Sequence, residues 1–168
     1  MCHPELCSRA VFLTGQMVVK LTNFASKREG KKPEHRPETY RALETLKSNV
    51  VTQKSNIWSL GVIAWEIFSL GEYPYENYGD AQPSKLINKL ETGYRLSKPI
   101  FATVKIYDLM KKCWNQIPEE RPSLQDIKLE TKEEINQFST SLWQLYESFL
   151  KDEAANEAGR KTKQSFAA

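Results

Sequence analysis

Residues 55–69 constrain the fold most, because their apolar side chains would cover nearly the whole circumference of a helix. Within residues 57–68, the polar side chains are those of Ser59 and Glu66. A helix that is apolar all round belongs in the core of a protein. No apolar run of the chain reaches the roughly 18 residues that a membrane span needs. The segment therefore predicts a buried core helix.

Shorter apolar segments on either side of this helix indicate a mainly helical chain with one small hairpin. Apolar and aromatic residues recur every three or four positions, as on one face of a helix. Two short runs rich in β-branched residues flank Gly15 and predict the hairpin. The predicted helices are residues 55–69 with Ser55 as N-cap, 82–92, 101–114, a helix from Ser123 with Leu124, Ile127 and Leu129 facing inward, and 131–151; the predicted strands are 10–13 and 17–21.

Charge and cysteine content narrow the class of protein. The chain of 168 residues is long enough for one domain with a core, and its net charge of +3 does not indicate a nucleic-acid or membrane partner. Residues 25–37 form a basic loop, for which a solvated segment is favoured over an anion-binding one. Cys2, Cys7 and Cys113 include no C-x-x-C pair, so reduced thiols are expected in place of disulfides or zinc ligands.

A series of motifs in a fixed order is more informative than composition. Residues 3–13, HPELCSRAVFL, resemble the catalytic loop HRDLAARNILL of tyrosine kinases, and eighteen residues after Glu5 the triplet NFA is similar to DFG. Further kinase-like segments follow at the family's spacing: PETYRALE at 37–44, SNIWSLGV at 55–62, WEIFSLG at 65–71, GYRL at 93–96, LMKKCW at 109–114 and PEERPS at 118–123. The chain is therefore identified as a member of the receptor-type tyrosine-kinase-like branch, degraded as in pseudokinases.

The resemblance implies a fold class, mainly α, namely the C-terminal lobe of a protein kinase with a small β-hairpin near the N-terminus. The family's glycine-rich loop and ATP-positioning lysine have no counterpart, so the N-lobe is expected to be absent. The implied domains are a kinase-like lobe at 1–130, with a catalytic-loop remnant at 2–13, a metal-motif remnant at 23–25 and an activation segment at 26–44, then an amphipathic helix at 131–152 and a flexible tail at 153–168.

The family's catalytic positions carry altered residues. Glu5 stands where the family has its catalytic Asp, and the extra methylene displaces the carboxylate, so we expect it not to function. Pro4 replaces an Arg and removes both a backbone N–H and a positive charge. Ala10 and Asn23 stand at the positions of the family's Mg ligands. A methyl group cannot coordinate a metal, and an amide lacks the charge that hard cations prefer.

Other positions of the family pattern are kept and imply structural roles. By resemblance, Glu44 and Arg121 are a buried ion pair that ties the activation segment to the end of the lobe. Asn56 replaces the Asp that anchors the catalytic loop, and its amide accepts hydrogen bonds without charge assistance. The implied structural residues are His3, Arg9, Phe24, Glu44, Asn56, Trp58, Gly61 and Arg121.

These substitutions favour an inactive tyrosine-kinase-like protein that acts in signalling as a binding or scaffolding module. One alternative is a fragment of an active or weakly active receptor-like tyrosine kinase, which would transfer the ATP γ-phosphate to tyrosine. Another alternative is a nucleic-acid-binding domain, which rests on the basic loop alone and predicts salt-sensitive binding.

Partners, cofactors and location follow from the same resemblance. No cofactor is expected, and ATP and Mg would bind only if a missing N-lobe were supplied. Protein partners are expected, either a kinase or an adaptor, and nucleic acid is not. The expected location is the cytoplasmic face, as a cytosolic protein or as the intracellular part of a membrane receptor, with membrane contact only through missing upstream sequence.

Overall fold

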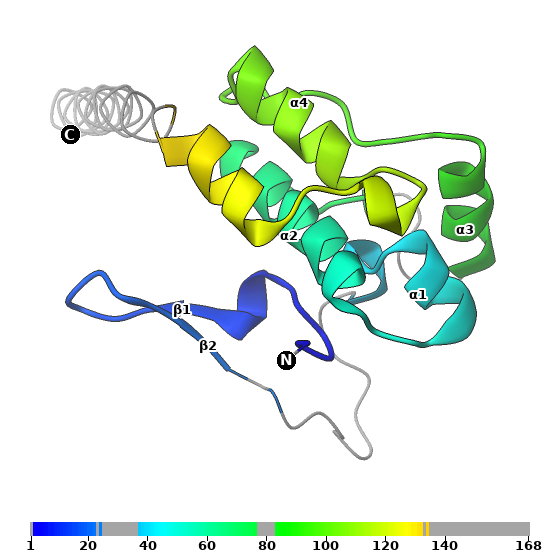
Figure 1. Ribbon diagram of the computed structural model, residues 1–168, viewed down its shortest axis with the longest axis horizontal. Coiled ribbons are helices and arrows are strands. Elements are labelled where there is room, and N and C mark those ends of the chain that lie inside the picture. Colours follow the sequence, from blue (N-terminus) through cyan, green and yellow to red (C-terminus); the bar gives the residue numbers. More distant parts are fainter. Residues whose placement is uncertain (1, 23, 25–36, 77–82, 133, 135–168) are drawn as a thin grey trace, which may run out of the picture. The chain divides into compact units, whose positions relative to one another are not determined.

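The computed structural model describes residues 2–22, 24, 37–76, 83–132 and 134. The chain divides into two compact units, residues 1–128 and 129–168. The first unit is mainly helical and has one two-stranded antiparallel sheet near its start (Figure 1). The predicted fold class is therefore confirmed. Of the second unit, the structure describes helical residues between 129 and 134, so most of the predicted helix at 131–152 and the whole tail at 153–168 lie outside the described residues.

The core helix is α2, Gln53–Phe68, and it begins two residues earlier than the sequence predicted. Thr52 is its N-cap, because the Thr52 hydroxyl accepts a hydrogen bond from the Ser55 N–H at 3.0 Å. The Ser55 hydroxyl in turn accepts from the Thr52 N–H at 2.8 Å, which completes a capping box. The prediction of Ser55 as N-cap is thus wrong by one turn. The helix ends where Gly71, at φ 89°, donates its N–H to the Glu66 carbonyl.

Close packing of α2 against α4, Val104–Cys113, builds the centre of the lobe (Figure 1). Gly61 permits this approach, since a Cβ at that position would lie 2.7 Å from the indole nitrogen of Trp114. Trp58 on α2 is completely buried. The guanidinium groups of Arg95 and Arg121 lie 4.8 Å and 5.1 Å from the centre of its ring. Cationic side chains from two distant segments therefore converge on one buried indole.

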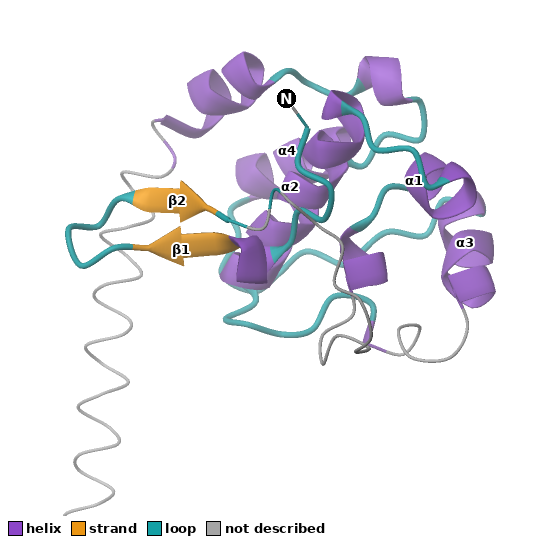
Figure 2. Ribbon diagram, turned by 90° about the horizontal axis from the view of Figure 1, so that it is seen from below, coloured by secondary structure: helices purple, strands orange, loops and turns teal. Residues whose placement is uncertain are grey.

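The hairpin consists of β1, Val11–Leu13, and β2, Val19–Leu21, and follows a short 3-10 helix, η1, Ser8–Ala10. The strands pair in antiparallel register, with Phe12 opposite Lys20. Figure 2 shows the hairpin extending to one side of the helices. Exposed apolar side chains on and around it are Phe12, Leu13, Met17, Val18, Val19, Leu21 and Phe24. Each of these side chains is between 45% and 74% exposed.

The remaining elements complete the lobe around this core. They are η2, Pro37–Tyr40; α1, Leu43–Ser48; α3, Pro83–Glu91; and η4, Pro118–Glu120, followed by helical residues from 124 onward. Helix α1, which the sequence did not predict, packs against α3, and an ion pair between Lys47 and Glu91 joins them.

The inward positions predicted after Ser123 are partly wrong. Leu124 is 67% exposed and Leu129 is 63% exposed, whereas Ile127 is half-buried. Ser123 does cap this helix, because its hydroxyl accepts a hydrogen bond from the Asp126 N–H. The apolar stripe on this turn is therefore narrower than its sequence indicated. Among the residues that the structure describes, no helix has the length and apolar character to cross a membrane.

Candidate functional site

The segment that resembles a catalytic loop is anchored to α2 by a two-way hydrogen bond. The His3 N–H donates to Asn56 Oδ1 at 2.7 Å, and Asn56 Nδ2 donates to the His3 carbonyl at 2.9 Å. The sequence predicted that Asn56 would accept hydrogen bonds, and here its amide also donates one. A carboxylate could not make this second bond, since it is an acceptor only. The asparagine is therefore suited to a segment that offers both an N–H and a carbonyl.

The buried His3 side chain holds the segment against the end of the hairpin. Its Nδ1 accepts the Glu5 N–H at 3.2 Å, and its Nε2 lies 2.6 Å from the Thr22 carbonyl. With Nδ1 as an acceptor, the neutral ring must carry its hydrogen on Nε2 and donate it to Thr22. The half-exposed Phe24 ring meets the imidazole edge-on, with 4.8 Å between the ring centres. His3 thus positions the backbone from residue 3 to residue 5.

Glu5, which the motif resemblance places at the position of the family's catalytic carboxylate, is engaged by another residue of the chain. Its Oε1 lies 3.3 Å from Nη2 of Arg41, in an ion pair whose two side chains are 38% and 25% exposed. Both residues line a cavity of about 10 Å³ together with Pro4 and Asn56. A cavity of that size holds roughly one water molecule. The carboxylate is therefore paired with an arginine of its own chain, while more than a third of its side chain remains exposed.

One of the two positions that the motif resemblance assigns to the family's metal ligands offers no ligand for Mg²⁺. Ala10 is 1% exposed, and its methyl group offers no oxygen. Asn23 lies outside the described residues. Within those that are described, no cluster of three or more histidine, cysteine, aspartate or glutamate side chains could hold a metal ion. Burial raises the pKa of the Cys7 thiol, which lies between Glu5 and Ala10 in the sequence.

Arg121 and Glu44 join two distant parts of the lobe. The fully buried Arg121 donates through Nη1 and Nη2 to the two Glu44 oxygens at 2.7 Å and 2.8 Å. It also donates to the carbonyls of Lys54 and Asn115, both at 2.9 Å. Four of its five N–H groups therefore have partners, as a buried guanidinium requires.

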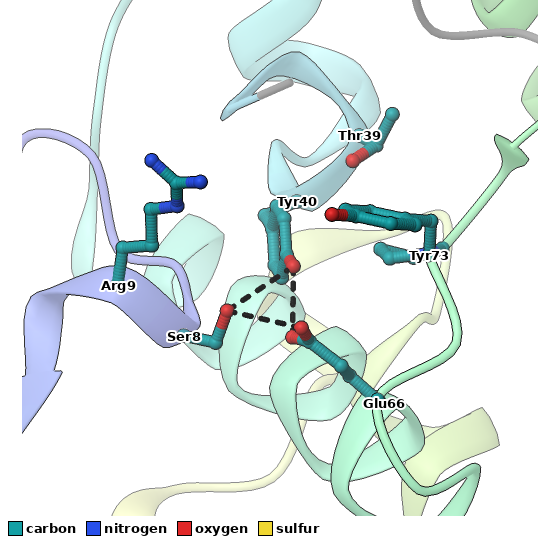
Figure 3. A pocket seen from close by; sticks show the side chains of 8 residues that line it. Ser8, Arg9, Thr39, Tyr40, Glu66 and Tyr73 are labelled. Atoms are coloured by element: carbon teal, nitrogen blue, oxygen red, sulfur yellow. Dashed lines mark hydrogen bonds between the residues drawn. The ribbon is translucent and has the colours of Figure 1, made fainter. Parts of the chain in front are cut away.

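A second cluster brings together the side-chain oxygens of Ser8 in η1, Tyr40 in η2 and Glu66 in α2. Ser8 Oγ donates to Glu66 Oε1 at 3.1 Å, and the buried Tyr40 hydroxyl donates to Glu66 Oε2 at 2.7 Å. Burial raises the pKa of Tyr40, and the adjacent Glu66 carboxylate acts in the same direction. Figure 3 shows this cluster with Arg9 on one side and Tyr73 on the other.

Comparison with known proteins agrees with this geometry. Residues 1–131 match the family described as protein tyrosine and serine/threonine kinase. The chain belongs to this family. Its fold, its hairpin and the order of its motifs now have a common explanation as parts of a kinase-like lobe.

Several relatives of this kinase-like chain are receptors by name. It is 38% identical to platelet-derived growth factor receptor alpha of Xenopus laevis over 74% of the chain, and 35% identical to the human receptor of that name over 90% of the chain. It is 31% identical to a fibroblast growth factor receptor of Halocynthia roretzi over 84% of the chain. The matched region spans 12% to 19% of the length of these relatives.

The site of this kinase-like chain contains residues that motif comparison did not single out. Sequence reasoning marked Glu5 and Asn56, and the structure brings both to one small cavity. It did not identify Arg41 as the partner of Glu5, or the hydroxyls that bind Glu66. One signal was available, because Glu66 is the one ionisable residue within the apolar run of α2 and a carboxylate there needs polar partners.

Proposed function

We propose that this chain is a non-catalytic tyrosine-kinase-like lobe of the receptor type that acts as a binding or scaffolding module. The observation that carries the proposal is the ion pair between Glu5 and Arg41. A general base must lie within hydrogen-bond reach of the proton that it removes, and be free to take it. The Glu5 carboxylate is instead engaged by Arg41 of its own chain.

The metal positions support the same proposal. Phosphoryl transfer depends on metal ions that neutralise the phosphates and hold them in line. The buried methyl group of Ala10 supplies no ligand for such an ion. We therefore expect no cofactor, with neither ATP nor Mg²⁺ bound through this lobe.

Contacts with other proteins are the role that remains for such a lobe. The hairpin exposes several apolar side chains, and exposed apolar residues are common at protein interaction sites. A kinase or an adaptor is the expected class of partner, and nucleic acid is not. Since the relatives are receptors by name, we place the chain on the cytoplasmic side of a membrane receptor.

The first test measures phosphate transfer by the protein that carries this chain, with ATP, Mg²⁺ or Mn²⁺ and a tyrosine-containing polypeptide. We expect no transfer above that of a sample without enzyme. Should transfer occur, two variants distinguish activity of this chain from that of a contaminant: Glu5→Ala and a matched change of an exposed carboxylate, Glu72→Ala. A signal lost in Glu5→Ala but kept in Glu72→Ala would show an active kinase and refute the proposal.

A second test measures nucleotide binding through thermal stability. A site whose Kd is a hundredth of the ATP concentration would stabilise the folded state by about 2.7 kcal/mol. For a domain of this size, that corresponds to a rise in Tm of about 5–10 °C. We expect no such rise with Mg²⁺ and ATP, and a saturable rise would contradict the proposed absence of nucleotide binding.

A further inference from the structure

A pocket beside η1 contains a carboxylate with no cationic partner among the described residues. The pocket has a volume of about 120 Å³ and is lined by Ser8, Arg9, Thr39, Tyr40, Glu66, Gly71, Tyr73 and Pro74. It is distinct from the small cavity at Glu5, with which it shares no lining residue. Its volume is about twelve times that of the cavity at Glu5, which is enough for the end of a side chain.

The oxygen cluster in this pocket has three oxygen–oxygen contacts of hydrogen-bond length but only two hydroxyl hydrogens to occupy them. Ser8 and Tyr40 both lie within hydrogen-bond distance of Glu66, and their own oxygens are 3.3 Å apart. Each hydroxyl carries one hydrogen and an ionised carboxylate carries none, so three contacts share two hydrogens. When both hydroxyls donate to Glu66, the contact between them has no hydrogen. The cluster therefore presents unused lone pairs and a negative charge.

The walls of the pocket are aromatic and polar. Figure 3 shows the hydroxyl end of Tyr73 directed into the pocket and the Tyr40 ring beside Glu66. Tyr73 is 63% exposed, so its ring lies at the mouth. Aromatic rings favour cations near their faces. The charge at the inner end and the walls thus favour a positively charged donor.

We propose that this pocket binds a primary ammonium group, supplied by a lysine side chain of a partner polypeptide. An ammonium has three hydrogens to donate, and Ser8 Oγ, Tyr40 Oη and the Glu66 carboxylate are three neighbouring acceptors. Binding would supply the missing hydrogen and a counter-charge in one group. This inference rests on the proposed function as a binding module, and it names the chemical group that the module would recognise.

A guanidinium and an anion fit this pocket less well. A guanidinium is a planar fork suited to the paired oxygens of one carboxylate, whereas the acceptors here belong to three different side chains. An anion would find Arg9 as a donor, but it would meet Glu66 at the inner end. The positive charge of Arg9 repels a bound cation, so removing this charge should change cation affinity and anion affinity in opposite directions. Neutralising Arg9 should tighten ammonium binding and weaken anion binding.

The test titrates the ¹⁵N-labelled chain with Nα-acetyl-L-lysine amide and follows amide chemical shifts in NMR spectra. The matched probe is Nα-acetyl-L-norleucine amide, which has the same alkyl stem without the ammonium. We expect saturable shifts around Ser8, Tyr40 and Glu66 with the lysine probe and none with the norleucine probe. Equal shifts with both probes, or none with either, would overturn the proposal.

Variants assign the binding to the oxygen cluster. Glu66→Gln should raise the Kd of the lysine probe at least ~10-fold, since a charge-assisted hydrogen bond is lost. Ser8→Ala, which keeps the carboxylate and leaves α2 unchanged, should raise it about 3- to 10-fold. Arg9→Gln should lower it about 2- to 5-fold. An unchanged Kd in Ser8→Ala, or a raised Kd in Arg9→Gln, would refute the assignment even if Glu66→Gln failed to fold.

A final arm identifies the source of the ammonium group. We expect acetyl-Gly-Lys-Gly-amide to bind more tightly than n-butylamine, because a polypeptide also contacts the mouth at Tyr73. Equal affinities would refute a polypeptide source. Neither probe reports phosphate transfer, so loss of ammonium binding would refute this inference and leave the non-catalytic proposal standing.

Discussion

Replacing Asn56 with aspartate removes one half of the two-way hydrogen bond that anchors the segment at residue 3. The Asn56 amide donates to the His3 carbonyl at 2.9 Å, and a carboxylate has no hydrogen for this bond. The His3 N–H would keep its acceptor, since Oδ1 remains. The carbonyl would instead face a negatively charged oxygen. By the motif resemblance, the same substitution introduces the residue that the family has at this position, so the expected loss of stability runs against the family pattern.

The magnitude follows from burial. His3 is 4% exposed, so little water can replace the lost donor. A buried acceptor left without a partner costs about 1–3 kcal/mol, and repulsion between two oxygens adds to this. We expect Asn56→Asp to lower the free energy of unfolding by about 2 kcal/mol. For a domain of this size, Tm should fall by about 4–8 °C.

Urea unfolding followed by circular dichroism measures this loss. Asn88→Asp is the matched control, because Asn88 lies exposed on α3 and the change adds the same charge. Pro4 lines the same small cavity as Asn56 but has no N–H to offer a carboxylate. In a Pro4→Ala background, the penalty of Asn56→Asp should therefore shrink by about 1 kcal/mol. An Asn56→Asp protein as stable as Asn88→Asp would refute the reasoning.

Three further substitutions test packing, capping and the buried ion pair by the same unfolding measurement. Gly61→Ala places a Cβ 2.7 Å from an indole nitrogen and should lower the free energy of unfolding by about 1–3 kcal/mol. Gly15→Ala, where a Cβ would have nothing within 4 Å, should change it by less than about 0.5 kcal/mol. Equal effects of the two substitutions would contradict close packing of α2. Thr52→Ala removes the N-cap and should cost about 1 kcal/mol, while Thr52→Ser should be nearly neutral. Arg121→Met strands Glu44 and should cost about 3–5 kcal/mol, and a loss under 1 kcal/mol would show that the pair contributes little.

Periodicity was sufficient to predict the core helix and the hairpin, because both depend on local patterns of apolar residues. It was not sufficient to place the start of α2. Thr52 and Ser55 are both good N-cap residues, and the choice depends on which hydroxyl accepts the other's N–H. Helix α1 has six residues, which is too short for a periodic signal.

The sequence predicted features of the candidate site only where they depend on the identity of a single residue. Loss of a metal ligand at Ala10 can be read from one residue, because a methyl group cannot coordinate an ion. The partners of Glu5 and Glu66 could not be read in this way. Arg41 lies 36 positions from Glu5, and Ser8 lies 58 positions from Glu66, so their contacts depend on how the elements pack.

The hydrogen bonds of Arg121 also determine when the lobe can fold during synthesis. They join it to Glu44 and Lys54, which precede it by 77 and 67 positions. Contacts between residues so far apart form slowly, because a long loop must close before they stabilise the chain. When residue 100 but not residue 121 has left the ribosome, α2 is already present but lacks the buried Arg121 side chain that packs against Trp58. We expect the nascent lobe to depend on chaperones during this interval and to close its core once η4 and Arg121 have emerged.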